Sequence, residues 1–348
     1  MKTLLEQLLR AAVQRLVGTL VPEMPEATAV EVERTRDATH GAFASNVAMR
    51  LAKVSRQNPL ELAPAIVAAL PPSPLVSKIE VSGNGFINFF LAPDALAREV
   101  RGIHELGDAY GRSSIGAGKA VTIGFVSNPL DVKQGRAAAY SESLSNVLAA
   151  AGYDVRRETL LEAPTVQHVT FHRGAERVRV GALRELREEV GDDACRFFLL
   201  MRSHEQNLDF DLTLATSRTN ENPLYYVQYA HARAASAVKE MKARGFSLDL
   251  AKGLDKLERL DKDAERALIA ALLRFPEEVE AAASNCAPHS IVYYLREVAN
   301  AFHTYYNAER WIVEETDLRN ARLALVLAAR QVIRNGLALL GVSFPESM

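Results

Sequence analysis

A short stretch in the second half of the chain contains the side chains best suited to bind a ligand. Tyr225, Tyr226, Tyr229, His231 and Arg233 lie in a helix predicted over 221–245. Aromatic rings stack on unpaired nucleic-acid bases, at about 1–3 kcal/mol per base. Tyr225 and Tyr229 share one helical face, whereas Tyr226 lies about 100° around the helix, so the three rings cannot all be core residues. We predict that at least one of these side chains contacts RNA, with core packing as the alternative.

A predicted β-hairpin over 166–180 carries a second group of candidate binding residues. His168 and His172 lie four positions apart on one strand and hence on one face. No third ligand has a suitable spacing, so the pattern predicts no metal site. The histidines fit better into a basic patch for RNA or an acidic partner, with a solvated hairpin face as the alternative. That patch comprises His168, His172, Arg173, Arg177 and Arg179.

Three other kinds of chemistry lack the residues that they need. Gly116, Gly118 and Lys119 resemble part of a phosphate-binding loop, but Ser113 and Ala120 occupy positions where that loop requires glycine and a hydroxyl residue. We interpret this segment as a linker. The two cysteines form no CxxC pair, which excludes a zinc ribbon and a redox motif. No serine has the histidine and aspartate partners of a catalytic triad.

Aromatic residues also end a helix predicted over 288–308. Tyr305, Tyr306 and Trp311 lie in its last turn and in the loop that follows. Their rings could stack on a base, but packing of the helix end is the favoured interpretation.

The composition is that of a globular protein without a strong charge bias. The 348 residues are 48% hydrophobic and 24% charged, with a formal net charge of -2, which excludes a disordered chain and a strongly basic nucleic-acid protein. Glu6 and Arg10 interrupt the apolar N-terminal segment, so we expect an amphipathic helix and no signal peptide. No apolar run approaches the roughly 18 residues of a membrane span. We expect a cytoplasmic protein without membrane or DNA partners.

The elements fall into three segments that must position these residues. Residues 1–119 mix helices with a strand pair over 76–91. Residues 120–190 combine a strand over 121–126, a helix over 135–152 and the hairpin. Residues 191–348 contain four predicted helices, which indicate a bundle. These helices are expected over 221–245, 261–284 (with a break at Pro276), 288–308 and 317–340.

Two long stretches resemble the arginyl-tRNA synthetases, a class I aminoacyl-tRNA synthetase family. HGAFASNVAMRLAK (40–53) with SGNGFINFFL (82–91) resembles the family's N-terminal domain, which contacts the tRNA elbow. Residues 191–215 and 220–233 resemble the start of its anticodon-binding helical domain. That domain is named for a D-A-L-R sequence, which reads Asp193-Ala194-Cys195-Arg196 here. We expect Arg196 to brace its helix through Asp209 or Asp211.

The resemblance assigns elbow-contacting positions in the first stretch. Phe43, Ser45 and Asn46 match the family pattern F-G-D-F-Q-S-N, in which the glutamine is Ala44 here. The resemblance therefore implies an elbow site weakened by one lost amide. A helix start, with Ser45 as the N-cap of a helix over 46–55, is the alternative.

The family's ATP-binding signatures are altered or absent. Asp131 and Gln134 occupy the positions of the two histidines of H-x-G-H, and Lys133 occupies the glycine position. A carboxylate there repels a triphosphate. The mobile K-M-S-K loop is missing between the hairpin and the next helix. Only residues 153–165 separate the central helix from the hairpin, whereas one βαβ unit takes about 30 residues.

These observations predict a multidomain α+β protein: an N-terminal α/β domain (1–119), a reduced remnant of a Rossmann-type domain (120–190) and an all-α helical bundle (191–348). We expect a non-catalytic paralogue that binds arginine tRNA, without catalytic residues, metal or cofactor. One alternative is a regulatory paralogue that has lost RNA binding and contacts a synthetase or a second copy. A second alternative is an ATP-independent transferase that uses charged tRNA, and a third is an engineered deletion.

Overall fold

The chain forms two compact units. The structure, a computed structural model, describes residues 1–25, 30–35, 38–160 and 166–348. Unit 1 spans Met1–Glu99 and unit 2 spans Val100–Met348. The division falls within α4 (Pro93–Leu106), earlier than the predicted boundary after residue 119. The reason is that the second half of α4 bonds to unit 2: Arg101 pairs with Asp255 at 2.7 Å, and His104 bonds to the carbonyl oxygen of Ala324 at 2.9 Å.

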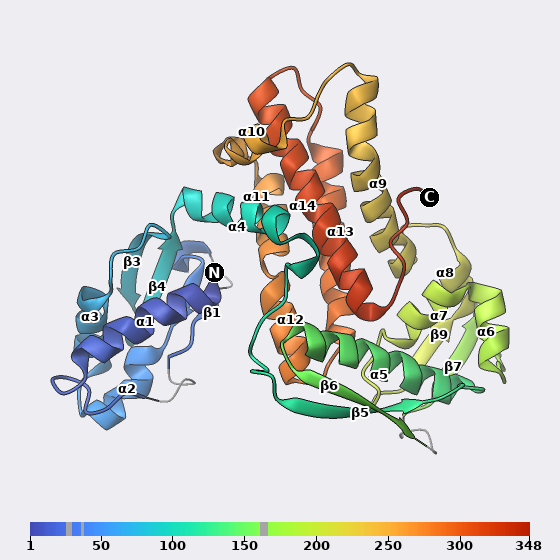
Figure 1. Cartoon of the computed structure of the whole chain (residues 1–348), viewed down its shortest axis with the longest axis horizontal. Coiled ribbons are helices and arrows are strands. Elements are labelled where there is room, and N and C mark those ends of the chain that lie inside the picture. Colours follow the sequence, from blue (N-terminus) through green and yellow to red (C-terminus); the bar gives the residue numbers. More distant parts are fainter. Residues whose placement is uncertain (26–29, 36–37, 161–165) are drawn as a thin grey trace. The chain divides into compact units, whose positions relative to one another are not determined.

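Unit 1 is an antiparallel sheet covered by helices (Figure 1). The strand order is β1 (Glu33–Arg34), β2 (Phe43–Ser45), β4 (Phe86–Leu91), β3 (Val76–Ser82), and the helices are α1 (Lys2–Leu16), α2 (Val47–Ser55) and α3 (Pro59–Ala69). Its core includes Leu5, Leu9, Phe43 and Phe89, all fully buried. A short 3-10 turn, η2 (Ala38–His40), precedes Gly41. Gly41 has a φ of +78°, and a Cβ on it would lie 2.5 Å from the carbonyl oxygen of Phe89, so only glycine fits there.

The first half of unit 2 contains one βαβ unit and a separate small sheet. β5 (Ala120–Val126) and β6 (Asp154–Leu160) are parallel and are joined by α5 (Val132–Ala150), which packs on them. The predicted hairpin is present as β7 (Val169–Arg173) and β8 (Glu176–Val178). A later strand, β9 (Leu208–Asp211), pairs in parallel with β7. The remaining elements are η3 (Gly107–Ala109), α6 (Leu183–Val190), α7 (Asp192–Leu199) and α8 (Leu212–Thr216).

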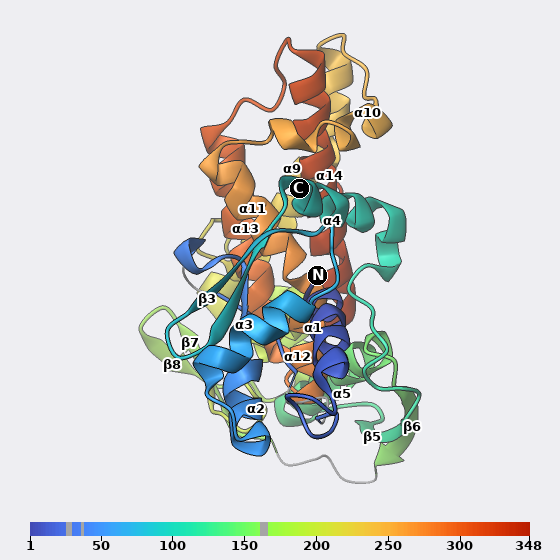
Figure 2. The same cartoon turned by 90° about the vertical axis from the view of Figure 1, so that its left-hand side faces the viewer.

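The second half of unit 2 is a helical bundle. It comprises α9 (Pro223–Ala243), α10 (Leu250–Leu254), η4 (Leu257–Arg259), α11 (Asp263–Leu273), α12 (Phe275–Ser284), α13 (His289–Ala308) and α14 (Thr316–Leu340). The helix predicted over 261–284 is divided at Arg274, and Pro276 lies in the first turn of α12 as expected. Among the described residues, α14 alone is long and apolar enough to cross a membrane, contrary to the sequence expectation, but 67% of its apolar window is buried in the bundle. It is the core helix that α9, α13 and α5 contact (Figures 1 and 2).

Candidate nucleic-acid interface

The tyrosines of α9 meet side chains of α13 in one aromatic cluster. Asn222 fixes where α9 begins: its side-chain oxygen accepts hydrogen bonds from the backbone N–H groups of Leu224 (3.0 Å) and Tyr225 (3.2 Å), and Pro223 follows as the first helical residue. The helical pitch then places the rings of Tyr225 and Tyr229 on one face of α9. The packing of α13 on α9 brings the rings of α13 beside them. The aromatic cluster comprises Tyr225, Tyr226, Tyr229, Arg233, His303 and Tyr306.

The tyrosine rings of the cluster are half-buried, and His303 is buried between them. Tyr225 and Tyr229 are parallel to within 17°, with ring centroids 5.6 Å apart. His303 lies 4.4 Å from Tyr226 and 5.7 Å from Tyr229. The hydroxyl of Tyr226 reaches Asn300 at 3.5 Å. Half-buried aromatic rings can stack with a further planar group, such as a base, wherever a ring face is free.

Arg233 ties the cluster together and gives it a positive charge. Its guanidinium carbon lies 4.1 Å from the ring centroid of Tyr306 and 5.1 Å from that of Tyr229. The guanidinium also donates a hydrogen bond to Nδ1 of His303 at 3.3 Å. Because arginine has no acceptor, Nδ1 is unprotonated, and Nε2 carries the proton that is donated to the carbonyl oxygen of Tyr226 at 3.1 Å. Burial lowers the pKa of His303, and the Arg233 charge lowers it further, so His303 is neutral at pH 7.

His231 does not belong to this face, contrary to the sequence prediction. It is 0% exposed, its Nδ1 bonds to the carbonyl oxygen of Pro345 at 2.8 Å, and the ring of Phe344 lies against it. The reason is helical geometry, because two positions after Tyr229 a side chain points to nearly the opposite side of α9. The sequence analysis favoured packing of the helix end for Tyr306 and did not identify His303 as a candidate. Of the two adjacent tyrosines, Tyr305 is fully buried and Tyr306 is half-buried.

The D-A-C-R segment holds the C-terminal residues in place. Asp193 accepts hydrogen bonds from the backbone N–H of Ser343 (3.0 Å), from the Ser343 hydroxyl and from the amide of Gln228 (3.0 Å). Arg196 pairs with Glu142 of α5 at 2.5 Å. The predicted partners of Arg196 were wrong, because Asp211 caps α8 and Asp209 faces His172. These residues therefore have structural roles.

Only one of the three predicted elbow residues has an accessible position. Phe43 is fully buried, and Ser45 is 2% exposed, with its hydroxyl bonded to the carbonyl oxygen of Glu31 at 2.6 Å. Ser45 also accepts from the N–H of Val47, although the N-cap of α2 is Asn46. Asn46 is half-buried and lines an open cavity of about 500 Å³. The prediction that Phe43 and Ser45 are contact residues is incorrect, because the alternation of β2 points both side chains into the core.

The predicted basic patch is partly neutralised by acidic neighbours. Arg173 pairs with Glu189 at 2.7 Å, and His172 lies 3.7 Å from Asp209, which the parallel β7–β9 ladder brings beside it. Three of its side chains remain exposed and form no ion pair within the described part of the chain: His168, Arg177 and Arg179. Within that part, no three side chains of metal-binding type are grouped so that they could hold an ion.

The N-terminus of α5 is capped by the protein itself. The carboxylate of Asp131 accepts a hydrogen bond from the N–H of Gln134 at 2.8 Å, and the Gln134 side chain accepts from the N–H of Leu130 at 2.7 Å. Lys133 is exposed. The start of α6 lies over this turn: Asp131 bridges to Ala182, and the N–H of Leu183 donates to Leu130. The Asp131 carboxylate therefore already occupies one backbone N–H at this helix end.

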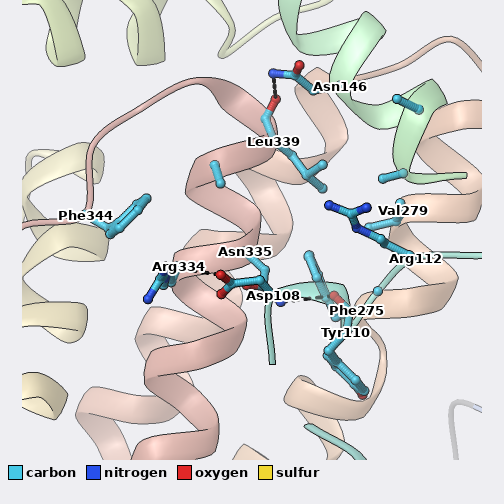
Figure 3. A pocket seen from close by; sticks show the side chains of 14 residues that line it. Asp108, Tyr110, Arg112, Asn146, Phe275, Val279, Arg334, Asn335, Leu339 and Phe344 are labelled. Atoms are coloured by element: carbon cyan, nitrogen blue, oxygen red, sulfur yellow. Dashed lines mark hydrogen bonds and ion pairs between the residues drawn. The ribbon is translucent and has the colours of Figure 1, made fainter. Parts of the chain in front are cut away.

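A cavity of about 360 Å³ lies among η3, α5, α12 and α14 (Figure 3). Several of its polar side chains are bonded: Asp108 pairs with Arg334, and Asn335 donates to the carbonyl oxygens of Gly107 and Tyr110. Asn146 donates to the carbonyl oxygen of Leu339 (Figure 3). The cavity is a packing junction between segments distant in sequence.

Comparison with known proteins identifies both ends of the chain. Residues 3–91 match the arginyl tRNA synthetase N terminal domain, and residues 227–348 match the DALR anticodon binding domain. These two ranges leave residues 92–226 between them.

Full-length relatives and solved structures agree with these matches. The arginine–tRNA ligase of Thioalkalivibrio sulfidiphilus is 31% identical over 590 residues, covering all of both chains, and that of Coxiella burnetii is 29% identical over 588. Arginyl-tRNA synthetase from Thermus thermophilus superposes with a TM-score of 0.76 at 16% identity over both full chains. The Plasmodium falciparum enzyme gives a TM-score of 0.71 at 10% identity, covering 100% of this chain and 99% of its own. The chain belongs to the arginyl-tRNA synthetase family.

Proposed function

We propose that this protein binds tRNA, arginine tRNA in particular, and does not aminoacylate it. It acts in the cytoplasm, where the two free thiols of Cys195 and Cys286 remain reduced. The RNA-binding part of the proposal rests on the aromatic cluster. Four of its residues lie within the region 227–348 that matches an anticodon-binding domain, and Tyr225 and Tyr226 directly precede that region. Half-buried stacked rings beside a guanidinium fit unpaired bases of an RNA loop, because stacking and cation–π contacts act on any base.

The absence of aminoacylation is supported by the N-terminus of α5. Phosphates bind at helix N-termini where backbone N–H groups are free and the helix dipole favours negative charge. Here the Asp131 carboxylate already occupies that position, and Leu183 lies over Gly135 so closely that an added Cβ would be 2.5 Å from it. A triphosphate would have to displace both and to face the Asp131 charge.

The length of the central region gives independent support for a truncated paralogue. An alignment of 590 positions exceeds the 348 residues of this chain, so a large part of it faces a gap here. Between the two matched ends, the described residues build a two-stranded sheet with one covering helix and a three-stranded sheet. We interpret this part as a reduced remnant of a Rossmann-type domain, without room for the doubly wound sheet that holds a nucleotide.

Titration of labelled arginine tRNA, followed by fluorescence anisotropy with another tRNA as competitor, tests the binding. Tyr229→Ala should raise Kd about tenfold, because a stacked base contributes about 1–3 kcal/mol and 1.4 kcal/mol corresponds to tenfold. Tyr293→Ala is the matched control, since Tyr293 is a 38% exposed tyrosine of α13 outside the cluster. Equal Kd values for both variants, or unselective competition, would exclude the cluster as the binding site.

ATP–pyrophosphate exchange tests the catalytic part separately. We expect no exchange that depends on arginine, with and without added tRNA. A signal that depends on arginine would overturn the loss of catalysis and leave the binding proposal intact.

A second candidate function, a regulatory paralogue that contacts protein partners, is favoured by the state of the other two predicted RNA sites. Phe43 and Ser45 are buried, and acidic partners neutralise Arg173 and His172. Affinity capture from lysate with nuclease treatment distinguishes the two functions: a protein partner such as a synthetase that survives the nuclease favours regulation.

A further inference from the structure

The sheet formed by β5 and β6 has two unpaired edges. Across residues 120–160 and the other described ranges, each of these strands has one partner strand, the other member of the pair. None of their residues is buried, although seven consecutive pairs run in register from Ala120–Asp154 to Val126–Leu160. Parallel strands normally lie within sheets whose faces are covered, so this pair is an exposed fragment of sheet. It runs along the lower margin of unit 2 (Figures 1 and 2).

The other sheet edges within the described ranges are protected against pairing with another molecule. β3 carries Lys78 and Glu80 and has an irregular register between Val76 and Lys78. β1, β8 and β9 are only two to four residues long. Short length, charges and bulges are the ordinary means by which an edge avoids pairing.

The two edges of the β5–β6 sheet differ in this respect. β6 contains four charged residues, Asp154, Arg156, Arg157 and Glu158. β5, with the sequence AVTIGFV, contains no charge and no proline, and its register is regular over all seven residues. β5 is therefore a long edge that is free of every protective feature of the others.

We propose that β5 pairs antiparallel with β5 of a second copy of this chain. The product is a continuous sheet in the order β6-β5-β5-β6, closed by a two-fold axis. Self-pairing suits β5, because an uncharged strand meets an identical uncharged strand and no like charges are opposed. The charged β6 strands remain outside and end the sheet, which prevents open-ended growth.

The oligomeric state of the full chain tests this proposal without RNA. Size-exclusion chromatography with light scattering should give about twice 38.2 kDa at micromolar concentration. In a pair centred on Ile123, the exposed Thr122 lies about 7–8 Å diagonally from its counterpart. Thr122→Lys and Thr122→Glu should each halve the mass, and an equal mixture of the two should restore it. Thr213→Lys and Thr213→Glu, on the exposed surface of α8, add the same charges elsewhere and should leave the mass unchanged.

Three results would overturn the proposal. A wild-type chain that is monomeric throughout the concentration range has no such interface. Single variants that stay dimeric, with circular dichroism equal to wild type, place the interface elsewhere. Species larger than a dimer mean that β5 pairs with the β6 edge of the next copy instead of with a second β5. The charge-swapped mixture also separates a lost interface from a misfolded variant, because misfolded chains do not recover the dimer mass on mixing.

Discussion

The guanidinium carbon of Arg233 lies 4.1 Å from the centroid of the Tyr306 ring, so a cation of α9 covers an aromatic ring of α13. The same group also covers Tyr229 and bonds to His303. Arg233 thus joins two helices through two rings and one imidazole. Any RNA-binding role of the cluster depends on this arginine in two ways, through its charge and through the positions of the rings.

Replacement of Arg233 separates these two contributions. Arg233→Ala should raise the Kd for tRNA about tenfold. Arg233→Lys should recover only part of that loss, because an ammonium keeps the charge but cannot stack as a plane or reproduce the bond to His303. The salt dependence of Kd distinguishes the roles: a slope reduced by about one in Arg233→Ala, and restored in Arg233→Lys, indicates a phosphate contact. Wild-type affinity in both variants would contradict a role for Arg233.

The stability of unit 2 should fall as pH decreases from 7 to 5. Burial lowers the pKa of His104, His231, His289 and His303 below the ordinary histidine value of 6.5. Below pH 6.5 the unfolded chain binds protons that the folded chain does not, so stability present above that pH is lost as pH falls toward the folded pKa values. Each such histidine contributes at most about 1.4 kcal/mol per pH unit.

Urea unfolding followed by the fluorescence of Trp311, the single tryptophan, measures this loss. His303→Asn should flatten the pH dependence of the unfolding free energy by a part of that amount. His168→Asn, at an exposed position, is the control variant. An equal slope in wild type and His303→Asn would show that His303 titrates alike in both states.

Local signals predicted the elements well and the environments of single residues less well. Asn222 followed by Pro223 marked the start of α9, and Gly152 marked the end of α5. Sequence also predicted that Tyr225 and Tyr229 share a face, and the structure confirms that their rings stack. These features depend on spacing within one element, which a sequence displays directly.

The errors concern partners that are distant in sequence. His303, 70 positions beyond Arg233, joins the cluster only through packing of α13 on α9. Glu142 reaches Arg196 because α5 packs on α7, and the C-terminal residues cover His231. Phe43 and Ser45 matched a family pattern, but the pattern does not tell which strand face is buried. Spacing therefore located the candidate residues, and only tertiary packing decided which of them are accessible.

Restoring the family's ATP signature in this chain should not restore chemistry. A triple variant with Asp131→His, Lys133→Gly and Gln134→His should show no ATP–pyrophosphate exchange dependent on arginine, because the start of α6 still covers the turn.

The triple variant should also be less stable than the wild-type chain. Loss of the Asp131 cap costs about 1 kcal/mol, and glycine in the first helical turn adds to that. Lys133→Ala, at an exposed position, is the control and should stay within about 0.5 kcal/mol of wild type. Measurable exchange in the triple variant would mean that the central region is complete enough to bind ATP.

The stability of the bundle depends on an ion pair in its interior. Glu265 is 0% exposed and accepts from Nε of Arg322 at 2.7 Å, while the second partner of Arg322, Glu309, keeps access to solvent. Glu265→Ala leaves a buried guanidinium without its main counter-charge, so it should lower the unfolding free energy by about 3–5 kcal/mol. Glu309→Ala should cost about 1 kcal/mol, because water can reach this partly exposed partner and replace it. Urea unfolding monitored by Trp311 reports on this region directly, since Trp311 lies two residues after Glu309, just beyond the end of α13. Equal losses in the two variants would mean that burial does not determine the strength of this pair.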